Sequence, residues 1–195
     1  MHVSSNELKT TVYKACVGQG VLRGIAQDIS NALVAPQRAD MGNEGIDPAL
    51  APAIGRLIDL LNAFDGGARD TIAPSMADEA VELAAANILD HGPSLVDLAV
   101  AFCGRGPIRI SVLDDRTWLE RLLDCRGVNY SLNETGGSLE LVAHGVEPET
   151  KTAPSGGFEV DEIQWAQLVA FANKTLVLSS DLTRADAGAG LNDND

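Results

Sequence analysis

The chain has few aromatic residues and no concentration of positive charge. Only 4% of its 195 residues are Phe, Trp or Tyr, so the core must consist mainly of Leu, Ile, Val and Ala. It carries 14 Lys and Arg against 28 Asp and Glu, a formal net charge of −14, with no Lys/Arg cluster. Because such a surface repels phosphate backbones, the composition argues against nucleic-acid binding.

Long apolar runs and paired cysteines are also missing. No run approaches the roughly 20 apolar residues that span a bilayer, and residues 1–7 lack the basic and apolar parts of a signal peptide. Cys16, Cys103 and Cys125 are odd in number and far apart, which favours reduced thiols. We therefore expect a cytoplasmic protein that does not interact with membranes.

No motif identifies a reaction, a catalytic residue or a cofactor. His2, His91 and His144 lack the close spacing to cysteines or carboxylates that zinc requires, so no metal site is predicted. Cys103 would need a nearby base or positive field to act as a nucleophile, and a buried structural thiol is the preferred interpretation.

An aspartate pair, Asp114-Asp115, follows a predicted strand. Ligands often gather at the carboxyl ends of strands. An aspartate there is also a common helix N-cap, and we interpret the pair as a cap.

Apolar spacing predicts helices over the first ninety residues. Ser4 and Glu7 form a capping-box pattern before the first helix, and Gly18 and Gly20 end it. A fourth, alanine-rich helix is predicted from about Ser75 to Leu89. The first three apolar stripes are Leu8, Val12, Ala15 and Cys16; Leu22, Ile25, Ala26, Ile29 and Leu33; and Leu50, Ile54, Leu57, Ile58, Leu61 and Phe64.

The sequence predicts that His91-Gly92-Pro93 ends the fourth helix. After it, the spacing of the apolar residues changes from the helical period to alternation. Ile108, Ile110 and Val112 alternate with polar residues, as in a half-buried strand. The segment Leu95–Phe102 is also interpreted as a buried strand rather than a short helix.

The rest of the second half alternates between helix and strand signals. A short helix carries Leu119, Leu122 and Leu123, and a final helix begins at Asp161-x-x-Gln164. Between them, Asn133–Gly137 is predicted as the turn of a hairpin. Leu176–Leu178 is predicted as a last strand.

This order predicts an α+β fold, in which a helical N-terminal half packs on a small mixed or antiparallel sheet. We expect a single domain over residues 1–195. Its parts are a helical half (1–92), a mixed half (93–181) and a Gly-rich acidic tail (182–195).

The tail is a candidate binding segment. Gly188 and Gly190 let the backbone approach a ligand or partner closely. Asp193 and Asp195 could present oxygens to a cation, and Arg184 could pair with an anion. A disordered acidic terminus is the alternative interpretation.

Both ends of the chain resemble a family of uncharacterised bacterial proteins, known as a domain of unknown function. The resemblance rests on the Ser4-x-Asn6-Glu7 start, and on the Gly188–Leu191 run with its Asn192–Asp195 close. It brings no activity, substrate or cofactor. It implies that the tail is a recurring feature, which favours docking.

Two functions from different classes remain open. The first is an accessory or non-catalytic subunit of a bacterial metabolic complex, which docks on a protein partner or a second copy through its tail. The alternative is a small-molecule enzyme or ligand-binding protein, whose pocket lies between the halves and is closed by the tail.

Overall fold

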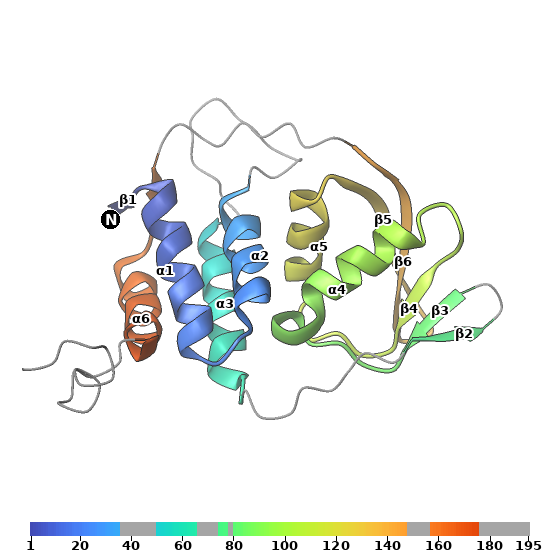
Figure 1. Ribbon diagram of the computed structural model, residues 1–195, viewed down its shortest axis with the longest axis horizontal. Coiled ribbons are helices and arrows are strands. Elements are labelled where there is room, and N and C mark those ends of the chain that lie inside the picture. Colours follow the sequence, from blue (N-terminus) through green and yellow to red (C-terminus); the bar gives the residue numbers. More distant parts are fainter. Residues whose placement is uncertain (36–49, 66–73, 78–79, 148–156, 176–195) are drawn as a thin grey trace, which may run out of the picture.

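A computed structural model describes residues 1–35, 50–65, 74–77, 80–147 and 157–175 (Figure 1). The helices are α1 (Ser5–Gly18), α2 (Arg23–Val34), α3 (Leu50–Ala63), α4 (Ile88–Ala101), α5 (Arg116–Cys125), α6 (Glu162–Ala172) and the short 3-10 turn η1 (Asn173–Thr175). The strands are β1 (His2–Val3), β2 (Ser75–Ala77), β3 (Ala80–Leu83), β4 (Ile108–Ile110), β5 (Val128–Thr135), β6 (Ser138–Val146) and β7 (Phe158–Glu159). The fold is α+β, as predicted.

The molecule has a helical layer and a sheet layer, which lie side by side along its long axis (Figure 1). In the helical layer, α1 packs between α2 and α6, and α3 contacts both α2 and α6. In the sheet layer, α4 and α5 pack against the strands in the order β2-β3-β4-β6-β5. This sheet is mixed, because β3 and β4 are parallel while its other neighbouring pairs are antiparallel.

The first helix forms as its sequence predicts. The Ser4 hydroxyl oxygen accepts a hydrogen bond from the Glu7 N–H at 3.2 Å, which satisfies one of the free donors of the first turn. All four residues of its apolar stripe are buried. Gly20 has the positive φ of 92° that favours glycine after a helix.

Gly18 has a different reason to be glycine. It is the last residue of α1, and a Cβ atom there would collide with the Phe171 carbonyl oxygen of α6. The missing side chain therefore allows the backbones of two helices from opposite ends of the chain to approach closely.

The predicted helix from Ser75 to Leu89 is wrong. Ser75–Ala77 and Ala80–Leu83 form an antiparallel pair of strands, β2 and β3, and only the last two residues enter a helix. The parallel pairing of β3 with β4, which places Val81 beside Ile108, outweighs the helix preference of the alanines.

The predicted break at His91-Gly92-Pro93 and the predicted strand Leu95–Phe102 are also wrong, because both segments belong to α4 or to its C-cap. The Asn87 side chain caps the helix through the Leu89 N–H at 2.8 Å. A Cβ atom at Gly92 would lie 2.7 Å from the Leu122 side chain, so glycine lets α5 pack closely on α4.

The remaining caps and the hairpin are confirmed, with one adjustment. Asp115 caps α5 through the Trp118 N–H at 2.9 Å, and Asp161 caps α6. Strands β5 and β6 form the predicted hairpin, but its turn is only Gly136-Gly137, both with positive φ, and Asn133–Thr135 belong to β5. The predicted strand Leu176–Leu178 lies outside the described residues.

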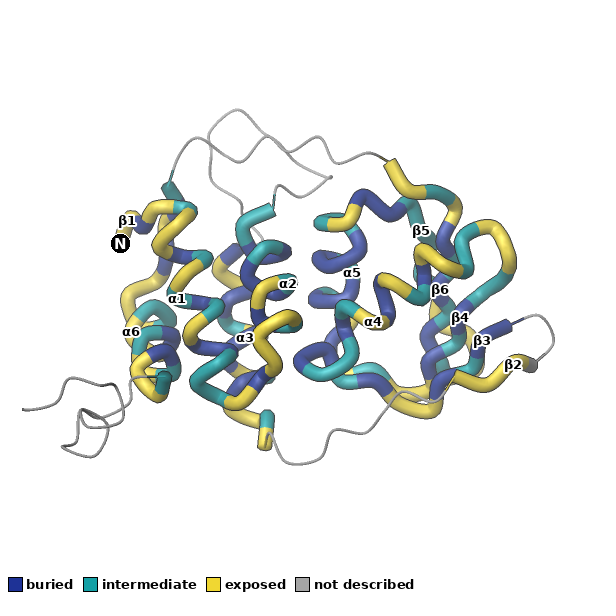
Figure 2. Tube along the Cα trace, in the orientation of Figure 1, coloured by how far each residue is buried: buried dark blue, intermediate teal, exposed yellow. Residues whose placement is uncertain are grey.

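One cluster of buried residues extends from the helical layer into the helices of the sheet layer, and Figure 2 shows buried positions in both layers. At this junction Arg121 of α5 is buried, and its guanidinium donates to the Leu33 carbonyl at the end of α2 at 3.3 Å. Arg56 of α3 donates to the Asp115 carboxylate at 3.2 Å. Polar contacts thus join the layers in addition to apolar packing.

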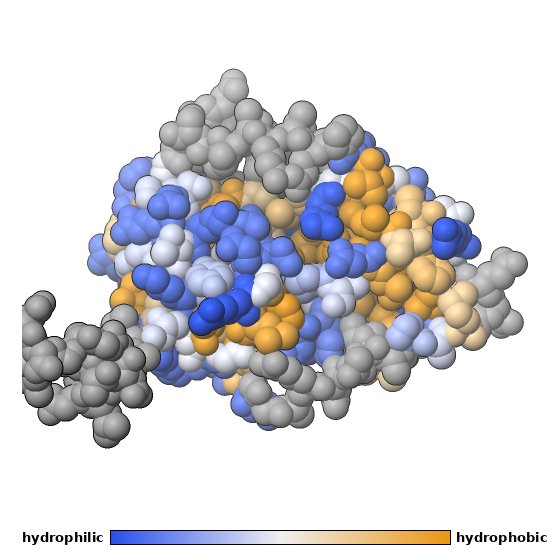
Figure 3. Space-filling model, in the orientation of Figure 1, coloured by the Kyte–Doolittle hydropathy of each residue, from blue (hydrophilic) through white to orange (hydrophobic). Residues whose placement is uncertain are grey.

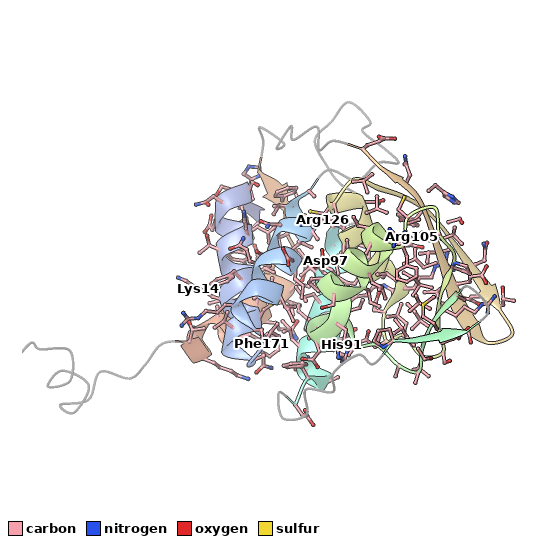
Figure 4. All side chains as sticks on the ribbon, turned by 45° about the vertical axis from the view of Figure 1, so that its right-hand side comes forward. Lys14, His91, Asp97, Arg105, Arg126 and Phe171 are labelled. Carbon is pink, nitrogen blue, oxygen red and sulfur yellow. The ribbon has the colours of Figure 1, made fainter. Side chains whose placement is uncertain are left out.

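A further polar contact joins α4 and α5 at the surface of the sheet layer. Arg126, which follows α5, donates to the Asp97 carboxylate of α4 at 3.2 Å, and Figure 4 shows these two side chains together. Burial raises the pKa of nearby Asp28 on α2, the Arg126 charge opposes that rise, and the Asp97 charge adds to it.

Candidate functional site

The carboxyl ends of the parallel strands β3 and β4 lie at the same end of the sheet layer, where α4 and α5 begin and the β5–β6 hairpin turns (Figure 1). Ligands of α/β folds often bind at such an edge. The loop after β3 reaches Asn87, and the loop after β4 runs from Ser111 to Asp115. These two loops define the candidate site.

Asp114 ties the two loops together. One of its carboxylate oxygens accepts hydrogen bonds from the N–H groups of Ile88 and Asp115, each at 2.9 Å. Burial raises the pKa of Asp114, those hydrogen bonds oppose the rise, and the Asp115 charge adds to it. With Asp115 capping α5, the pair serves the helix starts, which confirms its interpretation as a cap.

The chain after β4 contains an irregularity that opens the sheet. Ala86 donates its N–H to the Val112 carbonyl at 2.8 Å and accepts from the Asp114 N–H at 3.4 Å. Because a trans peptide points its C=O and N–H in opposite directions, the Leu113 N–H and C=O both face away from β3. Ile110 also faces away from β3, because the Leu83 carbonyl beside it accepts its hydrogen bond from the next residue, Ser111, at 2.9 Å.

Along a regular strand, the main-chain N–H and C=O groups of successive residues point alternately to the two neighbouring strands. Two residues whose groups point to the same side are therefore separated by an even number of positions. Ile110 and Leu113 are three apart, which means that one extra residue is accommodated between them, as in a β-bulge. The extra residue leaves the Val112 side chain 61% exposed, although the sequence predicts it as part of the half-buried strand.

Beyond Ile110 the hairpin turns away, and a depression of about 360 Å³ opens between it and the chain after β4. We call it the β4 notch. It is lined by Ile110, Ser111, Val112, Leu113, Arg116, Glu134, Gly137, Ser138 and Leu139. Among the described residues, the main-chain N–H groups of Leu113 and Gly137 have no hydrogen-bond acceptor. The notch therefore combines apolar side chains with open main-chain groups.

Charged side chains stand at the rim of the notch. Arg116, the first residue of α5, donates to Glu120 at 2.9 Å and lies 3.7 Å from the Glu134 carboxylate. The contact with Glu120 is the main reason that the pKa of Arg116 is raised. Glu134 is 78% exposed, so its carboxylate can meet a ligand from solvent.

The face of the sheet away from α4 and α5 carries a row of charges. Arg109 on β4 donates to Glu82 on β3 and to Glu140 on β6, each at 3.1 Å. No described helix covers this face (Figure 1). The guanidinium is held by both neighbouring strands, so the row supports strand pairing.

The described histidines and cysteines do not form a catalytic arrangement. Nδ1 of His91 accepts from the Asn87 N–H at 3.1 Å, and His144 bonds to the Ser131 hydroxyl at 3.1 Å. Burial raises the pKa of Cys16 to about 12. Cys103, predicted as a buried thiol, is half-buried.

Within the described ranges, no three or more His, Cys, Asp or Glu side chains gather as a metal site requires. None of the helices in these ranges combines the length and apolarity needed to cross a membrane.

The predicted tail residues Arg184, Gly188, Gly190, Asp193 and Asp195 lie outside the described residues. The β4 notch is not among the sites that the sequence predicts. Its one available signal was the Gly136-Gly137 pair, because a two-residue glycine turn fixes where the hairpin ends. The extra residue near Val112 leaves no comparable pattern in the sequence.

Comparison with known proteins finds no matching family model, no matching curated protein and no matching solved structure. The family resemblance of the two chain ends therefore remains a prediction.

Proposed function

We propose that the protein is a non-catalytic accessory subunit of a bacterial metabolic complex in the cytoplasm, and that it binds a protein partner through the β4 notch. The observation that carries the proposal is that, among the described residues, neither the N–H nor the C=O of Leu113 has a hydrogen-bond partner, beside the exposed Val112 side chain. Leu113 lies beyond the end of the central strand β4, and unpaired main-chain groups there can pair with another chain as those of an edge strand do.

The surface of the sheet layer supports a contact with a protein. On the face shown in Figure 3, hydrophilic side chains dominate over α1 and α2, and the larger apolar areas lie over the sheet layer. Apolar surface rimmed by charged residues is typical of interaction sites. The free state of all three cysteines is consistent with a cytoplasmic location.

The C-terminal tail is part of this proposal as a second contact. The same partner or a second copy of the chain would bind the tail residues Arg184, Gly188, Gly190, Asp193 and Asp195. Two contacts on one partner would raise the overall affinity above that of either contact alone.

The test is an affinity purification of the full chain from its native cytoplasm, with Val112→Asp compared with Ile163→Asp. Ile163 is an aliphatic residue on α6 that is 72% exposed, so its variant is a matched control for charge and exposure. We expect the unsubstituted chain and Ile163→Asp to retain a stoichiometric partner that Val112→Asp loses. Urea unfolding of all three proteins checks that their stabilities agree.

Two results would contradict the proposal. One is the absence of a stoichiometric partner for the unsubstituted chain. The other is a partner that Val112→Asp retains fully. A chain truncated after Ala185 reports separately on the tail, since loss of the partner there but not in Val112→Asp would assign binding to the tail alone.

A small-molecule enzyme or ligand-binding protein is the second candidate. The volume of the β4 notch, about 360 Å³, is within the range of small-molecule pockets, and Arg116 could orient an anionic group. The predicted site for this function is a pocket between the halves. A thermal-shift screen with divalent metals and small anions tests this candidate, and stabilisation that Val112→Asp abolishes would favour it over the partner.

A further inference from the structure

Resting on the proposed function, we propose that the occupant of the β4 notch is a basic, extended segment of the partner protein, which adds to the sheet as a strand beside Leu113. Three features of the notch favour this occupant: the direction of the main-chain groups, the apolar side chains around them and the charge of the rim.

The main-chain groups of Leu113 favour a partner segment with an extended backbone. Leu113 presents one donor and one acceptor on the same side, which is the pattern that a neighbouring strand matches with its own C=O and N–H. The hairpin cannot supply that strand, because β6 begins at Ser138 and its Leu139 is already paired with Ile110. Gly137 offers a second open N–H on the opposite wall.

The apolar side chains that line the notch favour an apolar or β-branched residue in the added segment. Val112 is exposed beside the open main-chain groups, and Leu113 and Leu139 line the floor. Side chains on neighbouring strands stabilise each other when aliphatic residues meet across the pair. A Val, Ile or Thr in the segment would cover Val112.

The charged residues at the rim of the notch favour a positively charged residue in the bound segment. The charge of Arg116 is already balanced by Glu120 at 2.9 Å, whereas Glu134 is 3.7 Å from Arg116 and largely exposed. A Lys or Arg of the segment would pair with Glu134 without displacing a short contact. The net charge of −14 attracts a basic segment over longer distances as well.

The experiment selects a random heptapeptide library, displayed on phage, on the immobilised full chain, with counter-selection on Val112→Asp. The best enriched peptide is then synthesised with N-methyl groups on either of its two alternating sets of main-chain nitrogens. We expect enrichment of Lys or Arg with β-branched residues. One N-methylated set should bind at least about tenfold more weakly, because it loses hydrogen bonds to the sheet, while the other set should bind normally.

Backbone amide NMR shifts locate the peptide. We expect the amide signals of Leu113 and Gly137 to move on addition of the peptide, and Glu134→Gln to weaken binding more at low salt than at high salt. Ser131→Ala, on the same strand as Glu134, is the control variant and should bind normally.

Three results would overturn the inference: no enriched peptide that depends on Val112, enrichment of acidic peptides, or equal affinity of both N-methylated sets. If the purified partner depends on Val112 but the N-methylated peptides bind equally, strand addition fails while the proposed function stands. If no partner is purified and peptides still bind as expected, the notch accepts strands but the proposed function fails.

Discussion

The helical layer and the sheet layer use their surfaces in different ways. In the helical layer, α1 is packed between α2 and α6, and Gly18 brings α1 and α6 into backbone contact. In the sheet layer, α4 and α5 lie on one side of the sheet. The other side carries the Glu82–Arg109–Glu140 row, in which Arg109 is 41% exposed.

This difference between the two layers indicates which surface of the molecule is available to a partner. The described helices of the first layer bury their apolar stripes against one another and against α4 and α5, so their role is to support the fold. The sheet layer buries one face and leaves the β4 notch with main-chain groups that have no hydrogen-bond partner within the described part of the chain. The proposed binding activity therefore belongs to the sheet layer, and three predictions test whether the two layers differ as described.

The largest expected difference is in thiol reactivity. Burial raises the pKa of Cys16 in the helical layer from 9.0 to about 12, so at pH 8 its thiolate fraction falls by about a thousandfold relative to an unperturbed thiol. Cys103 in the sheet layer is half-buried. Labelling with a chromogenic disulfide should therefore modify Cys103 quickly and Cys16 only on unfolding. The measurement uses Cys103→Ser/Cys125→Ser and Cys16→Ala/Cys125→Ser chains, and equal labelling rates would refute the burial of Cys16.

The second prediction concerns the contact between α1 and α6. Gly18→Ala should lower the free energy of unfolding by about 1–3 kcal/mol, because the new Cβ meets backbone that cannot move aside without shifting a helix. Gly24→Ala is the matched control in α2, where no atom lies within 4 Å of the new Cβ. The control should raise stability by about 0.4–1 kcal/mol. Urea unfolding measures both, and equal effects would mean that the helices are not in close contact.

The smallest expected effect is the pH dependence due to Asp114 in the sheet layer. Its pKa is raised in the folded protein above the ordinary value of 3.8, so the folded state binds the proton more tightly than the unfolded state does. Its contribution to stability is present below pH 3.8 and is lost as pH rises through the folded pKa. The difference in unfolding free energy between the unsubstituted chain and Asp114→Asn should therefore fall with rising pH in that window. A difference that rises with pH would show that hydrogen bonding, rather than burial, dominates at Asp114.

Elements with a cap and a full apolar stripe could be predicted from sequence. Ser4, Asp115 and Asp161 mark helix starts with side chains that satisfy nearby N–H groups, and such local signals depend on few distant residues. The α4 stripe of Ile88, Leu89, Gly92, Leu95, Val96 and Ala99 was also present, with helical spacing. Pro93 predicts a helix break, although α4 accommodates it as the sixth residue of the helix.

The sequence by itself determined the α+β class, three of the helix caps and the glycine turn of the hairpin, because these depend on side chains acting within a few residues. Only the tertiary structure decided that Ala80–Leu83 is a strand, since its parallel partner Ile108–Ile110 lies more than twenty residues away. It also decided that Gly18 serves a helix contact and that an extra residue near Val112 opens the β4 notch. Such features depend on which backbone segments contact each other in the folded protein, and local sequence patterns do not predict those contacts.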